Sequence, residues 1–271
     1  MGQLLAGMIT RADLLQAAIG YEEQFLGHPP SSVDGYGVGF YHAGEVLHRK
    51  RPIFEAASVT WPSLFEDVAS TIALAHVRVG TVGDARADNT HPFRMRQWLF
   101  AHHGSIVDFD AMRESILNGL PDFLQRNIRG ETDSEYIFHV LLARLHDASQ
   151  IDAQDVADEI VVQALQETVA EIDRHTTAAG VEAGQLNLAL TNGRALYLMR
   201  RGAPFYMVNR DQLPQQETDL DSRPVGPVRY MVALSCDECP APHGYGQIPD
   251  GCIVRVNREL DVAHHPLARP S

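Results

Sequence analysis

The chain has 271 residues, of which 45% are apolar and 21% are charged, an ordinary balance for a globular protein with a sizeable core. The formal charge of −13 argues against nucleic acid and anionic membranes as partners, because both recruit patches of Lys and Arg. No apolar run reaches the roughly 20 residues that cross a bilayer, and the start lacks the basic and apolar regions of a signal peptide. We therefore expect a cytoplasmic protein.

The first quarter of the chain predicts a strand, a helix and a hairpin. A short apolar run at residues 4–8 is typical of a strand, and Thr10 is a candidate cap for a helix over residues 11–25. The alternating small residues of 35–41 predict a second strand. A turn at Ala43-Gly44 then returns the chain along residues 45–48.

The remaining elements change from helices to strands along the chain. Helices are predicted at residues 63–69, 110–117, 132–146 and 151–177, and strands at 71–79, 97–102, 186–190, 195–200, 229–233 and 252–256, with a turn at Asn192-Gly193. Strands come first, helices in the middle and strands last. This order favours antiparallel sheets packed on each other with helices outside, and it differs from the strict alternation of a doubly wound fold.

Four clusters carry polar residues that a plain core would not need. They are His76-Val77-Arg78-Val79-Gly80-Thr81, Asn89-Thr90-His91-Pro92-Phe93, Trp98-Leu99-Phe100-Ala101-His102-His103-Gly104 and Thr132-Asp133-Ser134-Glu135. An arginine at a strand end can bind a ligand carboxylate through two parallel hydrogen bonds, although a structural ion pair would explain the residue equally well. The second cluster could also be no more than a buried loop anchor.

The third and fourth clusters each allow two interpretations. A strand that runs into Gly104 can aim a backbone N–H and a side chain at one point, as an oxyanion hole needs. The adjacent His102 and His103 are more typical of one core and one surface residue than of a metal pair. Thr132 and Glu135 fit a capping box. Asp133 would be stabilised by the helix dipole, and its carboxylate could also hold a ligand ammonium group.

Three cysteines lie in the last quarter of the chain. With His243, the residues Cys236, Cys239 and Cys252 have the spacing C-x2-C-x3-H-x8-C, which could give zinc a Cys3His shell. Structural zinc sites usually combine two knuckles, and only one C-x2-C is present. We therefore predict no metal site here, and neither a disulfide framework nor a redox role.

Taken together, the four clusters in this order resemble the class II glutamine amidotransferases of the N-terminal-nucleophile hydrolase superfamily. The likeness is to the short stand-alone branch, which includes the γ-glutamyl amidohydrolase of ergothioneine biosynthesis. It covers most of the chain, including Asp34-Gly35-Tyr36-Gly37-Val38-Gly39-Phe40-Tyr41 and Leu186-Asn187. The resemblance implies an α+β fold, a four-layer αββα sandwich of two mainly antiparallel sheets, as a single domain over residues 1–271. It implies no cofactor.

The resemblance also assigns roles to particular residues. Arg78 matches the residue that binds the substrate α-carboxylate, with Thr81 nearby, and Asp133 matches the anchor of the α-ammonium group. His91 lies in the segment that matches the family's Asn-x-His-Pro loop, and Gly104 matches the backbone donor of the oxyanion hole. The implied ligand is glutamine or another γ-glutamyl small molecule, and a partner enzyme subunit or self-association would be in keeping with the family.

Two positions depart from the family pattern. Gly2 stands where the family has its nucleophilic cysteine, and His103 stands where it has the oxyanion asparagine. Glycine has no side chain, so covalent catalysis by residue 2 is impossible. A histidine can donate one hydrogen bond to an oxyanion, but its ring is larger than an amide and its donor depends on the tautomer. Losing one oxyanion donor typically costs a factor of about 100–1000 in rate.

Three hypotheses follow for the function. The chain is a ligand-binding protein or non-catalytic subunit that keeps a glutamyl pocket without the chemistry. Alternatively, it is an active amidotransferase or γ-glutamyl amide hydrolase in which Gly2 replaces a natural cysteine. In the third, the pocket runs a different reaction with His102 and His103 as acid, base or metal ligands, since histidine transfers protons near neutral pH.

Overall fold

The structure is a computed structural model that describes residues 2–30, 33–53, 59–80, 83–214, 227–237 and 239–267. Its strands form two sheets, and every strand pairing is antiparallel. The seven-stranded sheet has the order β11-β9-β10-β1-β4-β2-β3. Its strands are β1 (Gln3–Ile9), β2 (Gly35–His42), β3 (Glu45–Pro52), β4 (Ile72–Arg78), β9 (Phe205–Arg210), β10 (Tyr230–Ser235) and β11 (Gly246–Gln247).

The second sheet has six strands in the order β13-β12-β8-β7-β6-β5. Its strands are β5 (Phe93–Met95), β6 (Trp98–Ser105), β7 (Gln185–Thr191), β8 (Leu196–Arg200), β12 (Cys252–Val256) and β13 (Val262–Pro266). The helices are η1 (Ala12–Leu14), α1 (Leu15–Leu26), α2 (Trp61–Leu64), η2 (Ala87–Asn89), α3 (Phe109–Asn118), α4 (Asp122–Gln125), α5 (Asp133–Asp147) and α6 (Asp158–Ala179).

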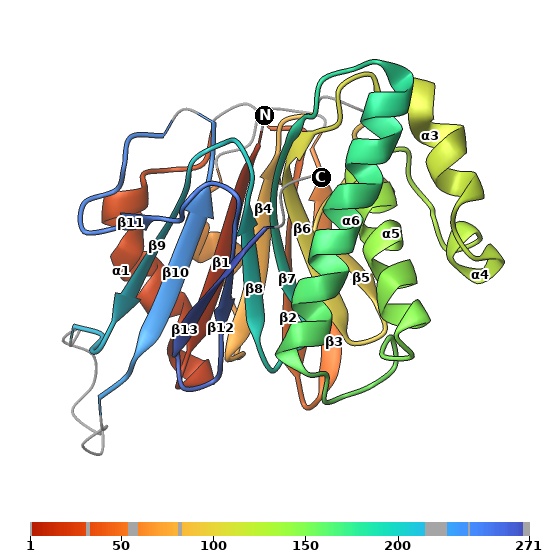
Figure 1. The fold of residues 1–271 in the computed structure, drawn as a ribbon. Coiled ribbons are helices and arrows are strands. Elements are labelled where there is room, and N and C mark those ends of the chain that lie inside the picture. Colours follow the sequence, from red (N-terminus) through yellow and green to blue (C-terminus); the bar gives the residue numbers. More distant parts are fainter. Residues whose placement is uncertain are drawn as a thin grey trace.

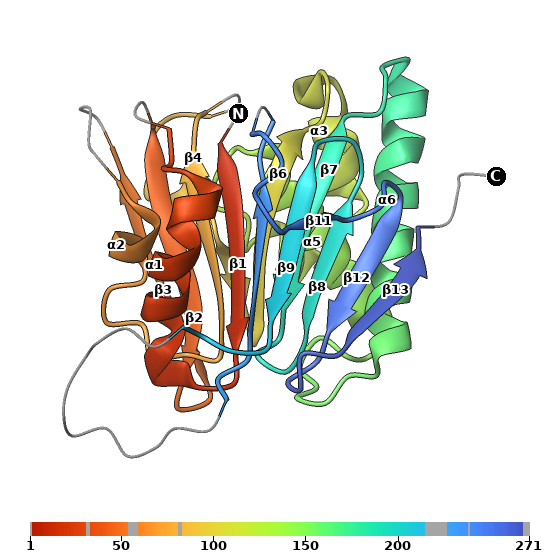
Figure 2. The ribbon, with the colours of Figure 1, turned by 90° about the vertical axis from the view of Figure 1, so that its left-hand side faces the viewer.

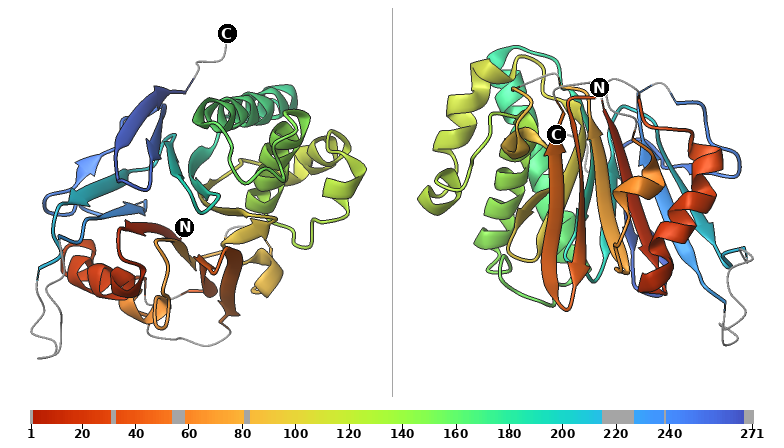
Figure 3. Two further views of the ribbon diagram at one scale, coloured as in Figure 1. Left: turned by 90° about the horizontal axis from the view of Figure 1, so that it is seen from below. Right: turned by 180° about the vertical axis from the view of Figure 1, so that it is seen from behind.

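The elements stack in four layers, which confirms the predicted αββα sandwich. Figure 1 shows α5 and α6 on the outer face of the six-stranded sheet, and Figure 2 shows α1 on the outer face of the other sheet. Seen from below, the two sheets lie between these outer helices (Figure 3). Three apolar clusters fill the three spaces between the layers, and the middle one joins the inner faces of the two sheets.

The position of strand β1 in the sandwich explains why the sequence begins with an apolar run. Leu5 and Ile9 pack in the cluster under α1, whereas Leu4, Ala6 and Met8 pack between the two sheets. Because alternate side chains of a strand point to opposite faces, both faces of β1 are buried. A central strand that is covered on both sides therefore needs a nearly continuous apolar sequence.

Several predicted boundaries are wrong at the helices. Thr10 does not cap the first helix: its hydroxyl donates to the Arg229 carbonyl at 3.2 Å, and α1 begins only at Leu15 after the short η1. The last long helix begins at Asp158 and not at residue 151. Ile151 and Val156 are nevertheless buried against the helical layer. Their apolar side chains continue the helical spacing before the helix begins, which explains the early predicted start. No helix within the described ranges is long and apolar enough to cross a membrane.

Candidate functional site

The predicted site residues converge at one end of the sandwich. Gly2 lies just before β1, and Arg78 is the last residue of β4. His103 and Gly104 lie near the end of β6, and Asp133 begins α5. These residues, together with His91, border a cavity of about 30 Å³ between the layers, at the end of the molecule where the N-terminus lies (Figure 1). Thr81 lies outside the described residues.

Gly2 is buried and fits closely against the end of β4. The neighbouring Gln3 pairs with Val77 across the antiparallel ladder. A Cβ atom built on Gly2 would lie 1.9 Å from the Val77 carbonyl oxygen and 3.1 Å from the Arg78 Cα atom. Both neighbours are backbone, which cannot rotate away as a side chain can. In this backbone arrangement, position 2 therefore accepts only glycine.

Arg78 is 5% exposed and contributes a buried cation to the cavity. Its Nη2 donates to the Gly83 carbonyl at 2.6 Å. Burial lowers the pKa of Arg78, and the nearby Asp34 and Asp84 carboxylates oppose that effect. Because the ordinary pKa of arginine is far above neutrality, the guanidinium keeps its charge and has the geometry to bind a carboxylate.

Asp133 is 3% exposed and occupies the first turn of α5. Its Oδ2 accepts from the Ile106 N–H at 2.7 Å, and its Oδ1 accepts from the Ser134 N–H at 2.8 Å. These bonds and the positive end of the helix dipole hold a carboxylate at the cavity wall. The arrangement is suited to a ligand ammonium group, which would supply the opposite charge.

The predicted capping box at the start of α5 is only half formed. Thr132 accepts from the Glu135 N–H at 3.3 Å, as the motif requires. The Glu135 carboxylate instead accepts from the N–H groups of Arg129 at 2.9 Å and Gly130 at 2.6 Å. Glu135 therefore anchors the loop that precedes the helix, and not the N-cap residue itself.

His103 is oriented by a carboxylate that the sequence did not indicate. Its Nε2 lies 3.2 Å from Oδ1 of Asp237, and this hydrogen bond lowers the pKa of Asp237. The other ring nitrogen, Nδ1, is buried without a partner among the described residues. Because a carboxylate accepts and cannot donate, Nε2 carries the hydrogen and Nδ1 of a neutral ring has the lone pair.

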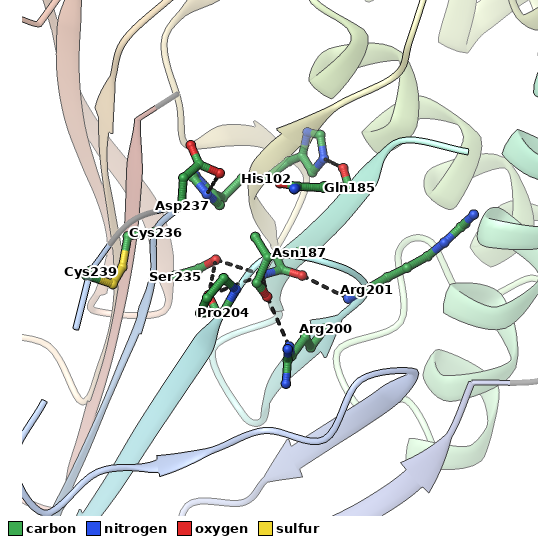
Figure 4. A network of polar contacts seen from close by, with 12 residues as sticks. His102, Gln185, Asn187, Arg200, Arg201, Pro204, Ser235, Cys236, Asp237 and Cys239 are labelled. Carbon is green, nitrogen blue, oxygen red and sulfur yellow. Dashed lines mark hydrogen bonds and ion pairs between the residues drawn. A yellow bond between two sulfur atoms is a disulfide. The ribbon is translucent and has the colours of Figure 1, made fainter. Parts of the chain in front are cut away.

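Gly104 follows His103 in a conformation that favours glycine. Its φ angle is 148°, and a Cβ atom there would lie 1.9 Å from the Gln185 carbonyl oxygen. The register pairs His103 with Asn187 on β7. Figure 4 shows Asn187 beside Ser235, with Asp237 close by at the end of β10. The Asn187 amide donates to Ser235 Oγ at 2.9 Å and thereby ties the two sheets together below the site.

Both adjacent histidines are buried, so the expectation of one surface residue is wrong. His102 is 1% exposed. It faces α5, with Nδ1 2.9 Å from Ser134 Oγ and Nε2 3.3 Å from the Gln185 carbonyl. Burial lowers the pKa of His102, an effect that the Asp133 carboxylate opposes. His102 and His103 therefore point to different partners and do not form a pair.

Two further histidines, which lie in separate sequence clusters, border the cavity and contact each other. The rings of His76 and His91 lie 4.1 Å apart between centroids. Both nitrogens of His91 and Nδ1 of His76 are buried without partners in the described part of the chain. Burial lowers the pKa of each well below its usual range. The cavity is thus lined by neutral imidazoles with open hydrogen-bonding positions.

The structure does not bring the three cysteines and His243 together at one point. Cys236 and Cys239 are joined in a disulfide. Cys252 lies in the other sheet, with its Sγ 3.6 Å from His264 Nδ1, and the His243 ring lies 6.3 Å from that of Phe25. Within the described ranges, no group of three or more His, Cys, Asp or Glu side chains is placed to hold a metal ion.

Comparison with known proteins places the chain in a family. The family description "Glutamine amidotransferases class-II" matches residues 1–251. The chain belongs to the class II glutamine amidotransferases. Among the relatives of this amidotransferase chain is the probable glutamine amidotransferase DUG3 of Saccharomyces cerevisiae, 31% identical over 186 residues, which are 63% of this chain and 52% of that protein. A putative glutamine amidotransferase of Haemophilus influenzae is 24% identical over 65% of this chain and 58% of its own length.

Solved structures with the same fold cover nearly the whole amidotransferase chain. A glutamine aminotransferase class-II domain protein from Silicibacter pomeroyi has a TM-score of 0.62 at 19% identity, covering 98% of this chain and 100% of its own. A predicted glutamine amidotransferase from Pseudomonas aeruginosa has a TM-score of 0.58 at 20% identity, covering 98% and 95%. At these identities the likeness establishes the fold. The matched segments span 52% and 58% of the length of these two curated relatives.

Proposed function

We propose that this amidotransferase chain binds glutamine or another γ-glutamyl compound and does not carry out the cysteine chemistry of its family. Arg78 would bind the ligand α-carboxylate and Asp133 its α-ammonium group. The observation that carries the proposal is Gly2, which borders the same cavity but has no room for a Cβ atom beside the Val77 carbonyl, at 1.9 Å. The cation and the carboxylate of a zwitterion site are present, and the nucleophile is not.

The electrostatics of the cavity suit a zwitterion better than a simple anion or cation. Arg78 and Asp133 are each no more than 5% exposed, so little water screens their interaction with a bound charge. A ligand with one charge alone would pair with one of the two groups and strip water from the other. A free amino acid end carries both charges and can pair with both groups.

The cavity must widen before such a ligand can enter. Its volume of about 30 Å³ is far below the roughly 300–1,000 Å³ of typical ligand pockets. The open state therefore costs free energy, and the observed affinity is reduced by the fraction of molecules that are closed. A widened cavity would also bring the open positions of His76 and His91 into contact with the ligand.

A chain of this kind would serve as a ligand sensor or as the non-catalytic subunit of a partner enzyme, and could also self-associate. Without a thiol at position 2 the chain can form no covalent intermediate there. The cytoplasmic location remains a prediction from the sequence.

Isothermal titration with L-glutamine and γ-glutamyl amides tests the proposed ligand. We expect Arg78→Ala and Asp133→Asn each to weaken binding about 10- to 100-fold, because each leaves a charged ligand group without its buried partner. Arg126→Ala and Asp122→Asn are matched controls, since both residues are highly exposed, 81% and 86%. Equal affinity in the site variants and the controls would contradict the assignment.

The alternative of an active hydrolase whose natural cysteine is replaced by Gly2 makes a different prediction. In that case Gly2→Cys would restore ammonia release, because the site would be built around the missing thiol. We expect no restored activity, since the Cβ atom of residue 2 meets backbone at 1.9 Å. Ammonia release by Gly2→Cys at rates well above the wild type would favour the alternative.

One observation favours a second candidate function, a hydrolysis without a thiol. His103 is held at Nε2 by Asp237 at 3.2 Å and has a buried, unpartnered Nδ1 within the described residues. A histidine oriented by a carboxylate can act as a general base toward water. In this candidate, Asp237→Asn would abolish a slow ammonia release that the wild type shows. No release from wild-type protein would exclude it.

A further inference from the structure

A second and larger cavity, of about 170 Å³, lies on the other side of the first turn of α5. Its walls come from the two edge strands β3 and β5, from the loop before α5 and from α5 itself. Glu135 borders this cavity, whereas Asp133, two residues earlier, borders the candidate glutamyl site. The two cavities are therefore neighbours with separate linings.

The rim of the second cavity carries three cations that have few or no hydrogen-bond or ion-pair partners among the described residues. The Lys50 ammonium lies 4.9 Å from the centre of the Phe93 ring, and it has no hydrogen-bond acceptor in the described part of the chain. The Arg129 guanidinium likewise has no hydrogen bond or ion pair among those residues. Arg94 is engaged through one nitrogen, which donates to the Val46 carbonyl at 2.6 Å. Burial lowers the pKa of Lys50 to about 8, which leaves it mainly protonated at neutral pH.

The acids of the cavity have other partners. Both carboxylate oxygens of Glu135 accept backbone N–H groups, from Arg129 at 2.9 Å and Gly130 at 2.6 Å. Asp88 lies 3.5 Å from the guanidinium of Arg86. Both carboxylates also act on the Lys50 ammonium and raise its pKa against the effect of burial, but neither forms an ion pair or hydrogen bond with Lys50 or Arg129 among the described residues. An external anion would supply that closer contact, in a protein whose net charge is −13.

The lining of the cavity also includes a histidine with a buried hydrogen-bond acceptor. His139 is 4% exposed, and its Nδ1 donates to the Glu135 carbonyl at 2.8 Å. Burial lowers the pKa of His139, so the ring is neutral near pH 7. Its Nε2 is buried with no partner within the described ranges. A neutral ring that donates through Nδ1 can only accept at Nε2, and this position therefore needs an O–H or N–H donor from a ligand.

We propose that this cavity binds a small hydroxylated oxyanion, a carboxylate or a phosphate of about amino-acid size. The charged group would lie between Lys50 and Arg129, and a hydroxyl would donate to Nε2 of His139. The buried rings of Phe93 and Phe138 would cover the carbon atoms. The size follows from the volume of 170 Å³, which is below the roughly 300–1,000 Å³ of typical ligand pockets and therefore suits a small ligand. The proposal does not depend on the glutamyl site.

Titration of the whole chain with L-malate, succinate and glycerol 3-phosphate tests the proposal. Malate and succinate differ by one hydroxyl, and glycerol 3-phosphate replaces the carboxylates by a phosphate. We expect malate or glycerol 3-phosphate to bind with a Kd at or below about 1 mM. Succinate should bind about tenfold more weakly than malate if malate binds, because His139 Nε2 would stay unsatisfied. The stronger of malate and glycerol 3-phosphate identifies the anion.

Substitutions locate the binding. Lys50→Met and Arg129→Gln should each weaken the better probe by about tenfold or more. Arg126→Gln, which removes the same charge three residues away at an 81% exposed side chain, should not weaken it. Arg78→Ala should also leave the affinity unchanged, which separates this cavity from the glutamyl site.

Three results would overturn the proposal. The first is that neither malate nor glycerol 3-phosphate binds with a Kd at or below about 1 mM. The second is that Lys50→Met and Arg129→Gln bind the better probe as tightly as Arg126→Gln does. The third is that malate binds but succinate binds equally well, which would remove the role of His139.

Discussion

Two regions of this molecule bury polar side chains in opposite ways. Under α1, Glu22 is completely buried, and its carboxylate accepts from Arg210 at 3.0 Å, Tyr230 at 2.7 Å and Tyr245 at 3.0 Å. At the candidate glutamyl site, His91 is buried with neither ring nitrogen partnered among the described residues. A satisfied network holds the fold together, whereas open buried positions cost stability and are available to a ligand.

The largest expected effect is at the satisfied network. Glu22→Ala should lower the free energy of unfolding by about 2–4 kcal/mol, because it empties a fully buried position and leaves the partly exposed Arg210 without its counterion. Tyr230 and Tyr245 would lose their acceptor as well. Urea unfolding at pH 7 measures this change. A loss below about 1 kcal/mol would mean that the network contributes little, and that satisfied and open regions do not differ as proposed.

The next effect concerns the close fit of Gly2. Gly2→Cys should lower the free energy of unfolding by about 1–3 kcal/mol, because the new Cβ atom overlaps the Val77 carbonyl oxygen. Gly2→Ala is the matched control, since it adds the same Cβ atom without a thiol, and it should cost about as much. A Gly2→Cys variant as stable as the wild type would show that position 2 readily accommodates a nucleophile.

Acid should weaken the open region more than the satisfied one. Burial lowers the pKa of His76 and His91, so below about pH 6.5 the unfolded chain binds protons that the folded chain does not. Stability therefore falls as pH falls, by up to about 1.4 kcal/mol per pH unit for each histidine. Urea unfolding at pH 7, 6 and 5 should give a shallower slope for His91→Phe than for the wild type. Identical slopes would argue against a buried neutral His91.

The smallest effect has the opposite sign to that of Glu22→Ala. At pH 7, His91→Phe should raise the free energy of unfolding by about 1 kcal/mol, because it removes buried nitrogens that lack partners. The same change should weaken glutamine binding if the widened cavity uses His91. A destabilised His91→Phe variant with unchanged glutamine affinity would place His91 among the structural residues.

The sequence predicted the central strands and the layer order because these elements bury apolar residues with a clear period. It missed β13, whose residues are at least partly exposed along an edge, so no buried face marks the strand. It also missed Asp237, which is 134 positions from His103 in sequence. Only tertiary packing brings such a pair together, so no local spacing in the sequence predicts it.

The residue types of the site were predictable, but their surroundings were not. Arg78, Gly104 and Asp133 follow from motifs at strand ends and a helix start. The close approach of Gly2 to the Val77 carbonyl and the unpartnered nitrogens of His91 depend on how three layers meet. The disulfide of Cys236 with Cys239 runs against the expectation that these cysteines form no disulfide framework, and it depends on the local path of the chain.

The central claim is that the chain binds a glutamyl ligand and leaves it intact. Nuclear magnetic resonance can measure both binding and hydrolysis in one sample, which contains the wild-type protein and L-glutamine labelled at the side-chain amide nitrogen. The account predicts saturable broadening of the ligand signal and no ammonium signal over many hours. Steady conversion to ammonium, or an unaffected ligand signal at millimolar glutamine, would contradict it.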